Sequence, residues 1–369
     1  MLFIKSYIKS VQFFFMFIII MYCTSCKENQ NKVVTIHAAG LYTDSLNPGP
    51  LFFLNKDTGF ILGSYLVDAK NPVYPKKDDR EYLGTKWVAL LWKTIDGGRN
   101  WTKKIWGEGH IAQIDRFGDS VIALMKTDRY TRVFISSVFN PDNWKEITYF
   151  PRYAYHICAS GNQMAALKTD SFKYKIFFCF SDNRGRDWMN NCEPIHDPYQ
   201  YPVLKDGKLF YLARFESDKK YPDSLVVYDF AKNSDKLIKL PKDFLCLGVS
   251  CVQNNIYLTG FMSGGITIYQ LDPTLEFKKL YTYAANNLSD PLVYYKSNGA
   301  DWIFAVENNG SRKKIAIIKT SDNGKSFETF KVDYIRNIYL HSFIEQDSMV
   351  KVWFFNESGK FQIFESKNK

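Results

Sequence analysis

Short runs of alternating apolar and polar residues, with Gly, Asp or Asn close to their ends, continue along most of the chain. Examples are residues 59–66, 87–94, 120–126 and 132–138. Alternation of this kind is typical of β-strands that bury one face. The 369 residues include 24 Tyr and 30 Phe, and aromatic residues favour strands. The pattern therefore predicts an all-β protein.

An eight-residue turn of the form S/T-x-D/N-x-G-x-x-W/F occurs three times, at 94–101, 181–188 and 320–327. The side chain at the third place can accept hydrogen bonds from N–H groups of its own turn, and Gly supplies a positive φ. The aromatic residue begins the next strand and is expected to pack beneath the turn. The residues at these places are Asp96, Gly98, Trp101, Asn183, Gly185, Trp188, Asp322, Gly324 and Phe327.

These turns resemble the Asp box, or BNR repeat, of the sialidase-like β-propellers. A degenerate copy lies at 137–144, and its Trp144 stands 43 residues after Trp101 and 44 before Trp188. That period is typical of one four-stranded propeller blade. The last three expected strands, 337–343, 349–355 and 360–365, leave a blade incomplete, and the isolated strand 32–38 can complete it. We therefore expect seven blades, with six or eight as alternatives.

The first 26 residues have the pattern of an export signal. Lys5 and Lys9 precede an apolar run at 11–22, which is too short to span a bilayer and is followed by small residues. Thr24 and Ser25 before Cys26 resemble a bacterial lipobox, and the Lys-Glu pair after Cys26 resembles the surface-export signals of Bacteroidetes lipoproteins. This predicts a signal peptide at 1–25, lipidation of Cys26, a tether at 26–32 and a single propeller domain at 33–369. An ordinary secretion signal is the alternative.

The net charge of +10 falls to +8 when Lys5 and Lys9 leave with the signal. The remaining excess is spread along the chain without a basic stripe, which argues against binding to nucleic acid. An exported chain meets an oxidising environment, and Cys179 and Cys192 flank the second turn, which makes them the candidate pair for a disulfide. The sequence shows no metal-binding or nucleotide-binding motif, and we expect a monomer with no cofactor and no metal.

The resemblance implies that the Asp boxes lie on the face opposite the ligand site. The ligand face would then be built where the chain enters each inner strand. Candidate ligand-binding residues at these places are His110, Arg152, Tyr155, His156, Tyr201, Arg336 and His341. The alternative is that these side chains fill the channel and satisfy one another. A loop at 67–86 interrupts the first blade, and long loops of this kind are usually functional or disordered.

Sialidases share an early Arg-Ile-Pro motif and an arginine triad, and neither is found here. Another glycosidase mechanism would need two carboxyl groups across the pocket, for which Glu108 and Asp290 are candidates. We therefore expect a membrane-anchored lipoprotein at the outer membrane, on the cell surface or the periplasmic side, that binds a glycan or a protein without catalysis. An exo-acting glycoside hydrolase of the sialidase superfamily is the alternative.

Overall fold

The computed structural model describes residues 31–36, 47–68, 71–75, 85–127, 130–151, 154–170, 175–189, 198, 201–213, 221–285, 288–297, 299–309, 312–333, 343–346, 349–355 and 361–367. Every regular element in this part of the chain is a β-strand, so the predicted all-β class is confirmed. Among these residues there is no helix long and apolar enough to cross a membrane.

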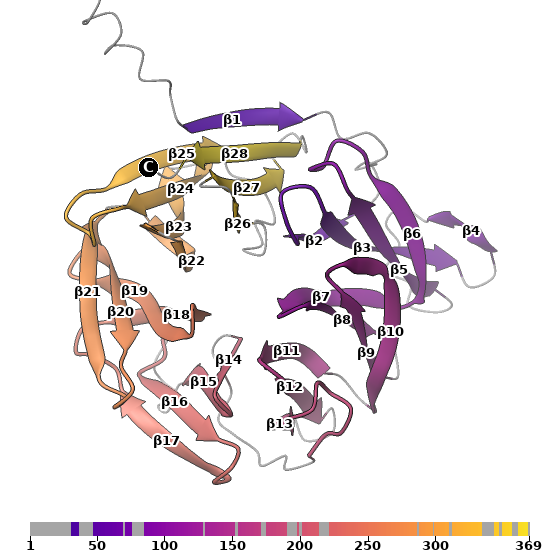
Figure 1. Cartoon of the computed structure of the whole chain (residues 1–369), viewed down its shortest axis with the longest axis horizontal. Helices are drawn as coiled ribbons and strands as arrows, with labels where there is room; N and C mark the ends of the chain where they lie inside the picture. Colours follow the sequence, from indigo (N-terminus) through magenta and orange to yellow (C-terminus); the bar gives the residue numbers. More distant parts are fainter. Residues whose placement is uncertain are drawn as a thin grey trace, which may run out of the picture.

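The described strands form seven antiparallel sheets, which are arranged as a ring and which we call blades one to seven (Figure 1). Blades one to three are β2 (Asn47–Phe53), β3 (Gly59–Asp68), β5 (Thr85–Thr94) and β6 (Thr102–Glu108), with β4 (Asn71–Pro75) paired to β3; β7 (His110–Phe117), β8 (Ser120–Lys126), β9 (Tyr130–Ser137) and β10 (Asn140–Pro151); and β11 (Ala154–Ser160), β12 (Gln163–Asp170) and β13 (Lys175–Ser181).

The other four blades each contain four described strands. They are β14 (Val203–Lys205), β15 (Lys208–Ala213), β16 (Ser224–Asp229) and β17 (Ser234–Lys239); β18 (Leu245–Val252), β19 (Asn255–Met262), β20 (Gly265–Leu271) and β21 (Phe277–Ala284); β22 (Leu288–Ser297), β23 (Ala300–Asn309), β24 (Arg312–Thr320) and β25 (Glu328–Asp333); and β26 (Phe343–Gln346), β27 (Met349–Phe355), β28 (Phe361–Lys367) and β1 (Asn31–Ile36).

The ring is closed by a strand from the beginning of the chain. β1 pairs antiparallel with β28, from Asn31 opposite Ser366 to Ile36 opposite Phe361, and it forms the outer strand of blade seven (Figure 1). The N-terminal strand thus completes the last blade, as the strand pattern predicts. Because β26, β27 and β28 come from the other end of the sequence, this pairing joins the two ends of the described chain.

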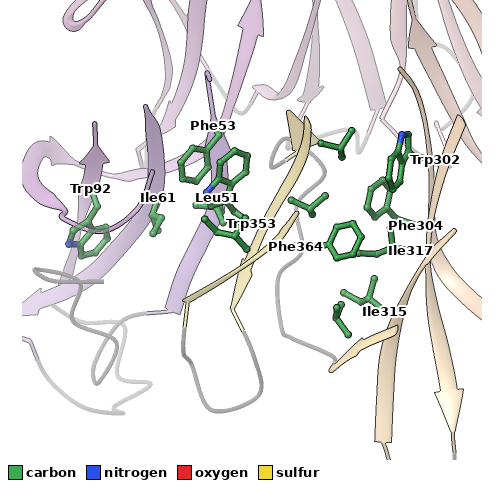
Figure 2. Close-up of a cluster of buried hydrophobic side chains, with 14 of the residues drawn as sticks. Leu51, Phe53, Ile61, Trp92, Trp302, Phe304, Ile315, Ile317, Trp353 and Phe364 are labelled. Carbon is green, nitrogen blue, oxygen red and sulfur yellow. The ribbon is translucent and has the colours of Figure 1, made fainter. Parts of the chain in front are cut away.

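Large apolar side chains fill the space between blade seven and its two neighbours (Figure 2). The ring of Trp353 stacks on that of Phe53 in blade one, with centroids 3.9 Å apart and an angle of 9° between the planes. On the other side, Phe364 meets Trp302 of blade six edge to face at 6.5 Å. Similar buried clusters lie between each of the other neighbouring blades. Burial of this apolar surface is the main force that holds the ring together.

Four details differ from the expectations or lie beyond the described residues. The segment 67–86 contains β4, and β3 and β5 both extend into it, so part of it is sheet because its backbone finds partners there. The strand expected from Trp144 begins earlier, at Asn140. The strand expected at 337–343 is found at Phe343–Gln346, with 334–342 outside the described part. The segment predicted as the signal peptide and most of the tether also lies outside it.

Strand direction gives the ring two distinct faces. In blade two, the inner strand β7 starts at His110 on one face of the ring and runs toward the other face. β9 runs in the same direction as β7 because each neighbouring pair is antiparallel. The starts of the inner strands therefore share one face, which we call the entrance face. The turns between third and fourth strands, including 94–101, 181–188 and 320–327, lie on the opposite face, which we call the turn face.

Candidate functional site

The predicted ligand residues that the structure describes lie at the entrance face, on blades two, three and four. His110 is the first residue of β7, Tyr155 and His156 are the second and third of β11, and Tyr201 lies two residues before β14. Arg152, Arg336 and His341 lie outside the described residues, so their roles stay predictions.

Two of these side chains, which are far apart in sequence, meet at the boundary of blades three and four. The rings of His156 and Tyr201 stack with centroids 4.4 Å apart and planes 12° apart. Tyr201 is 63% exposed, whereas His156 is half-buried, so the histidine supports one face of a tyrosine ring that remains open to solvent. An exposed, braced aromatic ring is a surface on which the apolar face of a sugar can pack.

Tyr155 has a different environment. Its half-buried side chain packs against the apolar cluster between blades three and four, which includes Leu167 and Tyr211. This contact favours the alternative in which part of the predicted aromatic set fills the ring. Tyr155 therefore belongs to the packing between these blades.

Lys126 lies beside His110 on the entrance face, and sequence reasoning missed it. The two residues are directly opposite in the β7–β8 pair, which places their side chains on one face of the sheet. Burial lowers the pKa of the half-buried Lys126 ammonium, and among the described residues it has neither a hydrogen-bond nor an ion-pair partner. A partly desolvated cation of this kind attracts an anionic group. The only sequence signal at Lys126 was the repetition of ALMKTD (123–128) as ALKTD (166–170). That repetition indicates how blades two and three align and says nothing of a binding role.

The two carboxylates considered for glycosidase chemistry cannot be placed relative to each other. Glu108 is exposed at the end of β6, beside Gly109. Gly109 has a φ of 124° and would place a Cβ 2.2 Å from the Lys126 carbonyl oxygen, so only glycine fits there. Asp290 lies on β22, and its side chain is outside the described part of the structure. The catalytic assignment of both residues stays a prediction.

On the turn face, the first repeated turn is held by its own side chains. Asp96 Oδ1 accepts hydrogen bonds from the Thr94 hydroxyl and the Asn100 N–H, both at 2.9 Å. Gly98 has a φ of 97°, and the Trp101 indole N–H donates to its carbonyl at 2.8 Å. Burial acts to raise the pKa of Asp96, but the hydrogen bonds from Asn100 and Thr94 outweigh it and leave the pKa lowered.

The other two turns repeat this arrangement. Asn183 Oδ1 and Asp322 Oδ1 each accept a hydroxyl two residues earlier and an N–H four residues later, all at 2.9 Å. Gly185 and Gly324 have positive φ values of 75° and 82°. The pKa of Asp322 is lowered to about 2, mainly by hydrogen bonds from Ser326. These polar groups are engaged within their own turns, so their role is structural.

The degenerate segment 137–144 forms a different turn. β9 ends at Ser137 and β10 begins opposite it at Asn140, which leaves a two-residue connection with no glycine. The Ser137 hydroxyl accepts a hydrogen bond from the Phe139 N–H at 3.2 Å. The Ser136 hydroxyl lies 3.0 Å from both the Asn140 and the Asn143 carbonyl oxygens and shares its hydrogen between them. Trp144 nevertheless packs inward, edge to face with Trp106 at 4.9 Å. The degenerate copy thus keeps the bonded hydroxyl of the first place and the packed Trp of the eighth, but its third residue, Phe139, offers no side-chain acceptor.

Inside the ring, a polar side chain connects blades two and three. Gln113 of β7 donates to the Ile157 carbonyl at 2.7 Å and accepts from the Ile157 N–H at 2.8 Å. A cavity of about 30 Å³ beside it, also lined by Asp115 and Arg116, has room for roughly one water and not for a sugar. Burial raises the pKa of Tyr295 on β22; the charge of Asp115 also raises it, and that of Arg116 lowers it.

The cysteines do not provide reactive thiols in the described part of the chain. Burial raises the pKa of the Cys158 and Cys246 thiols far above the ordinary range and also raises that of Cys251, which disfavours the reactive thiolate. Cys179 is completely buried and Cys192 lies outside the described residues, so the candidate disulfide is untested. Nor do the described residues contain a group of three or more His, Cys, Asp or Glu suited to a metal ion.

Comparison with known proteins agrees with this architecture. An oligogalacturonate lyase in complex with manganese superposes with a TM-score of 0.54 at 10% identity, over 92% of this chain and 98% of the lyase. An oligogalacturonate lyase from Vibrio parahaemolyticus gives 0.52 at 11% identity, over 92% and 97%. The β-propeller domain of the Trilobed protease from Pyrococcus furiosus gives 0.53 at 9% identity, over 89% and 96%.

At the sequence level, no family model and no curated protein matches the chain. Identities of about a tenth establish a shared fold and leave function open. The strand order, the closure of the ring by β1 and these superpositions together show that the chain is an all-β protein with the β-propeller fold.

Proposed function

We propose that this protein is a membrane-anchored β-propeller lipoprotein that binds a glycan at its entrance face and does not convert it chemically. The observation that carries the proposal is the His156–Tyr201 stack, in which a 63% exposed tyrosine ring is braced by a ring from the neighbouring blade. A ring already held in place loses little conformational entropy when a sugar packs on it.

The surroundings of this pair favour a polar ligand. Lys126 and His110 lie on the same face of the ring in blade two, and Tyr130 and Tyr149 form a second exposed aromatic pair there, with centroids 6.3 Å apart. Aromatic surfaces combined with a few polar groups are typical of ligand sites that select orientation as well as shape.

The anchor and the family assignment rest on the sequence. Thr24, Ser25 and Cys26 follow a short apolar run, which favours cleavage before Cys26 and acylation of its thiol, with the protein held at the outer membrane on the cell surface or the periplasmic side. The Asp-box resemblance is supported by the matching hydrogen bonds at Asp96 and Asp322.

Binding of the mature protein to a glycan array, followed by affinity measurements on the retained glycan, tests the proposal. Tyr201→Ala should weaken the affinity by at least ten-fold, about 1.4 kcal/mol, because it removes the exposed ring. Leu237→Ala is the matched control: Leu237 is also exposed, at 49%, but it lies on β17, the outer strand of blade four. We expect this control to bind as the unaltered protein does.

Two results would contradict the proposal. Retention of no glycan, with capture of a protein ligand that Tyr201→Ala abolishes, would assign the same face to protein binding. Hydrolysis of the retained glycan or of an aryl glycoside, lost in Glu108→Gln, would show an enzyme and refute the binding-only function.

A further inference from the structure

Three exposed apolar side chains stand at the tips of neighbouring blades on the turn face. Ile95, Phe139 and Met189 are 70%, 83% and 44% exposed, and each lies in or directly after the connection that follows the third strand of blade one, two or three. The first two tips are joined by an ion pair between Lys93 and Asp142, with 2.6 Å between Nζ and Oδ2.

The corresponding connections of blades four, five and six, which the structure describes in full, expose no large apolar side chain. Their exposed residues include Ala231, Lys232, Pro273, Thr274, Ser321 and Lys325. The repeated turn therefore does not require an apolar tip, since Ser321 holds the place of Ile95 in the third turn. The apolar tips gather on one half of the turn face, and exposed apolar groups that gather in this way mark a contact surface.

The beginning of the chain reaches the same part of the molecule. β26 runs from the entrance face to the turn face. Because neighbouring strands in the order β26, β27, β28, β1 are antiparallel, β1 starts at the turn face and runs back toward the entrance face. Asn31 therefore lies at the turn face of blade seven, which packs directly against blade one. Cys26 is five residues earlier, and a chain of that length spans at most about 18 Å.

We propose that Ile95, Phe139 and Met189 enter the interfacial layer of the bilayer to which Cys26 is anchored. The turn face of blades one to three then rests on the membrane, and the entrance face with Tyr201 points away from it. This inference rests on the proposed lipid anchor. Transfer of the exposed side chains out of water is favourable, and a second apolar contact strengthens an attachment that depends on acyl chains.

The experiment uses the full-length lipidated protein in vesicles of phosphatidylethanolamine and phosphatidylglycerol that also carry a nitroxide-labelled lipid. A fluorophore is attached to Phe139→Cys and, in a matched variant, to Tyr149→Cys. Both side chains are highly exposed. Phe139 directly precedes β10 and Tyr149 lies near its end, so they stand on opposite faces of the ring. Unaltered protein treated with the same dye reports any label on native cysteines.

We expect at least two-fold stronger quenching by the nitroxide lipid at residue 139 than at residue 149. Lys232→Cys, at the polar tip of blade four, should also be quenched less than residue 139. Equal quenching at residues 139 and 149, in protein that sediments with the vesicles, overturns the inference. The tip at Phe139 would then face solution, a second copy of the chain or another protein, and not the bilayer. Protein that fails to sediment, like its Cys26→Ser variant, refutes the lipid anchor and the inference with it.

Discussion

At the scale of single residues, each repeated turn is held by the hydroxyl at its first place and the carboxylate or amide oxygen at its third. Asp322 Oδ1 and Oδ2 accept hydrogen bonds from the Ser326 N–H and hydroxyl, at 2.9 and 2.5 Å, and Asn183 holds the same place in the second turn with an uncharged amide. The charge of Asp322 is therefore not needed for the turn to form, but it makes the stability of this turn depend on pH.

The pH dependence has a definite sign. The pKa of Asp322 falls from 3.8 to about 2 in the folded protein, so its contribution to stability is complete above its unfolded pKa and is lost as the pH falls through the folded value. Between about pH 4 and pH 2, we expect the melting temperature of the unaltered protein to fall further than that of Asp322→Asn, which has no carboxyl group to titrate at this position. A constant difference between the two melting temperatures across this range would contradict the assignment.

At the scale of elements, the pairing of β1 with β28 closes the ring, and it can be tested with proline. Val33 and Val34 of β1 lie opposite Phe364 and Ile363 of β28. The N–H groups of successive strand residues point to opposite edges of the strand, so only one of the two valines donates a backbone hydrogen bond to β28. Proline at the donating residue removes a ladder hydrogen bond.

We therefore expect one of the variants Val33→Pro and Val34→Pro to lower the free energy of unfolding by about 1 kcal/mol or more relative to the other. Each variant is the matched control of the other, since both introduce the same residue into the same strand. Chemical denaturation measures the difference. Two variants that both unfold like the unaltered protein would show that β1 does not hold the ring closed.

Local features of the fold could be predicted from sequence, and non-local ones could not. The turn at Asp322 is predictable because its acceptor, glycine and aromatic residue all lie within eight residues. At 137–144 the serine and the tryptophan are recognisable from sequence, but the conformation of a loop without the acceptor and the glycine is not. The His156–Tyr201 contact joins side chains that are far apart in sequence and come from two blades, and the burial of Lys126 depends on the folded sheet. Neither feature could be read from the sequence alone.

At the scale of the whole molecule, the two faces of the ring have different tasks. The turn face holds the hydrogen-bonded turns, the apolar tips and the start of β1. The entrance face holds the exposed aromatic pairs and the half-buried Lys126. Since the exposed aromatic rings lie on the entrance face, we expect a ligand to bind from that side.

Hydrogen–deuterium exchange of the protein with and without the retained glycan tests this account most directly. We expect the glycan to slow exchange of the backbone N–H groups around residues 154–160 and 201–205, where His156 and Tyr201 stack, and to leave residues 94–101, 181–188 and 320–327 unchanged. Slower exchange in those three turns, with no change around His156 and Tyr201, would contradict the placement of the binding site on the entrance face.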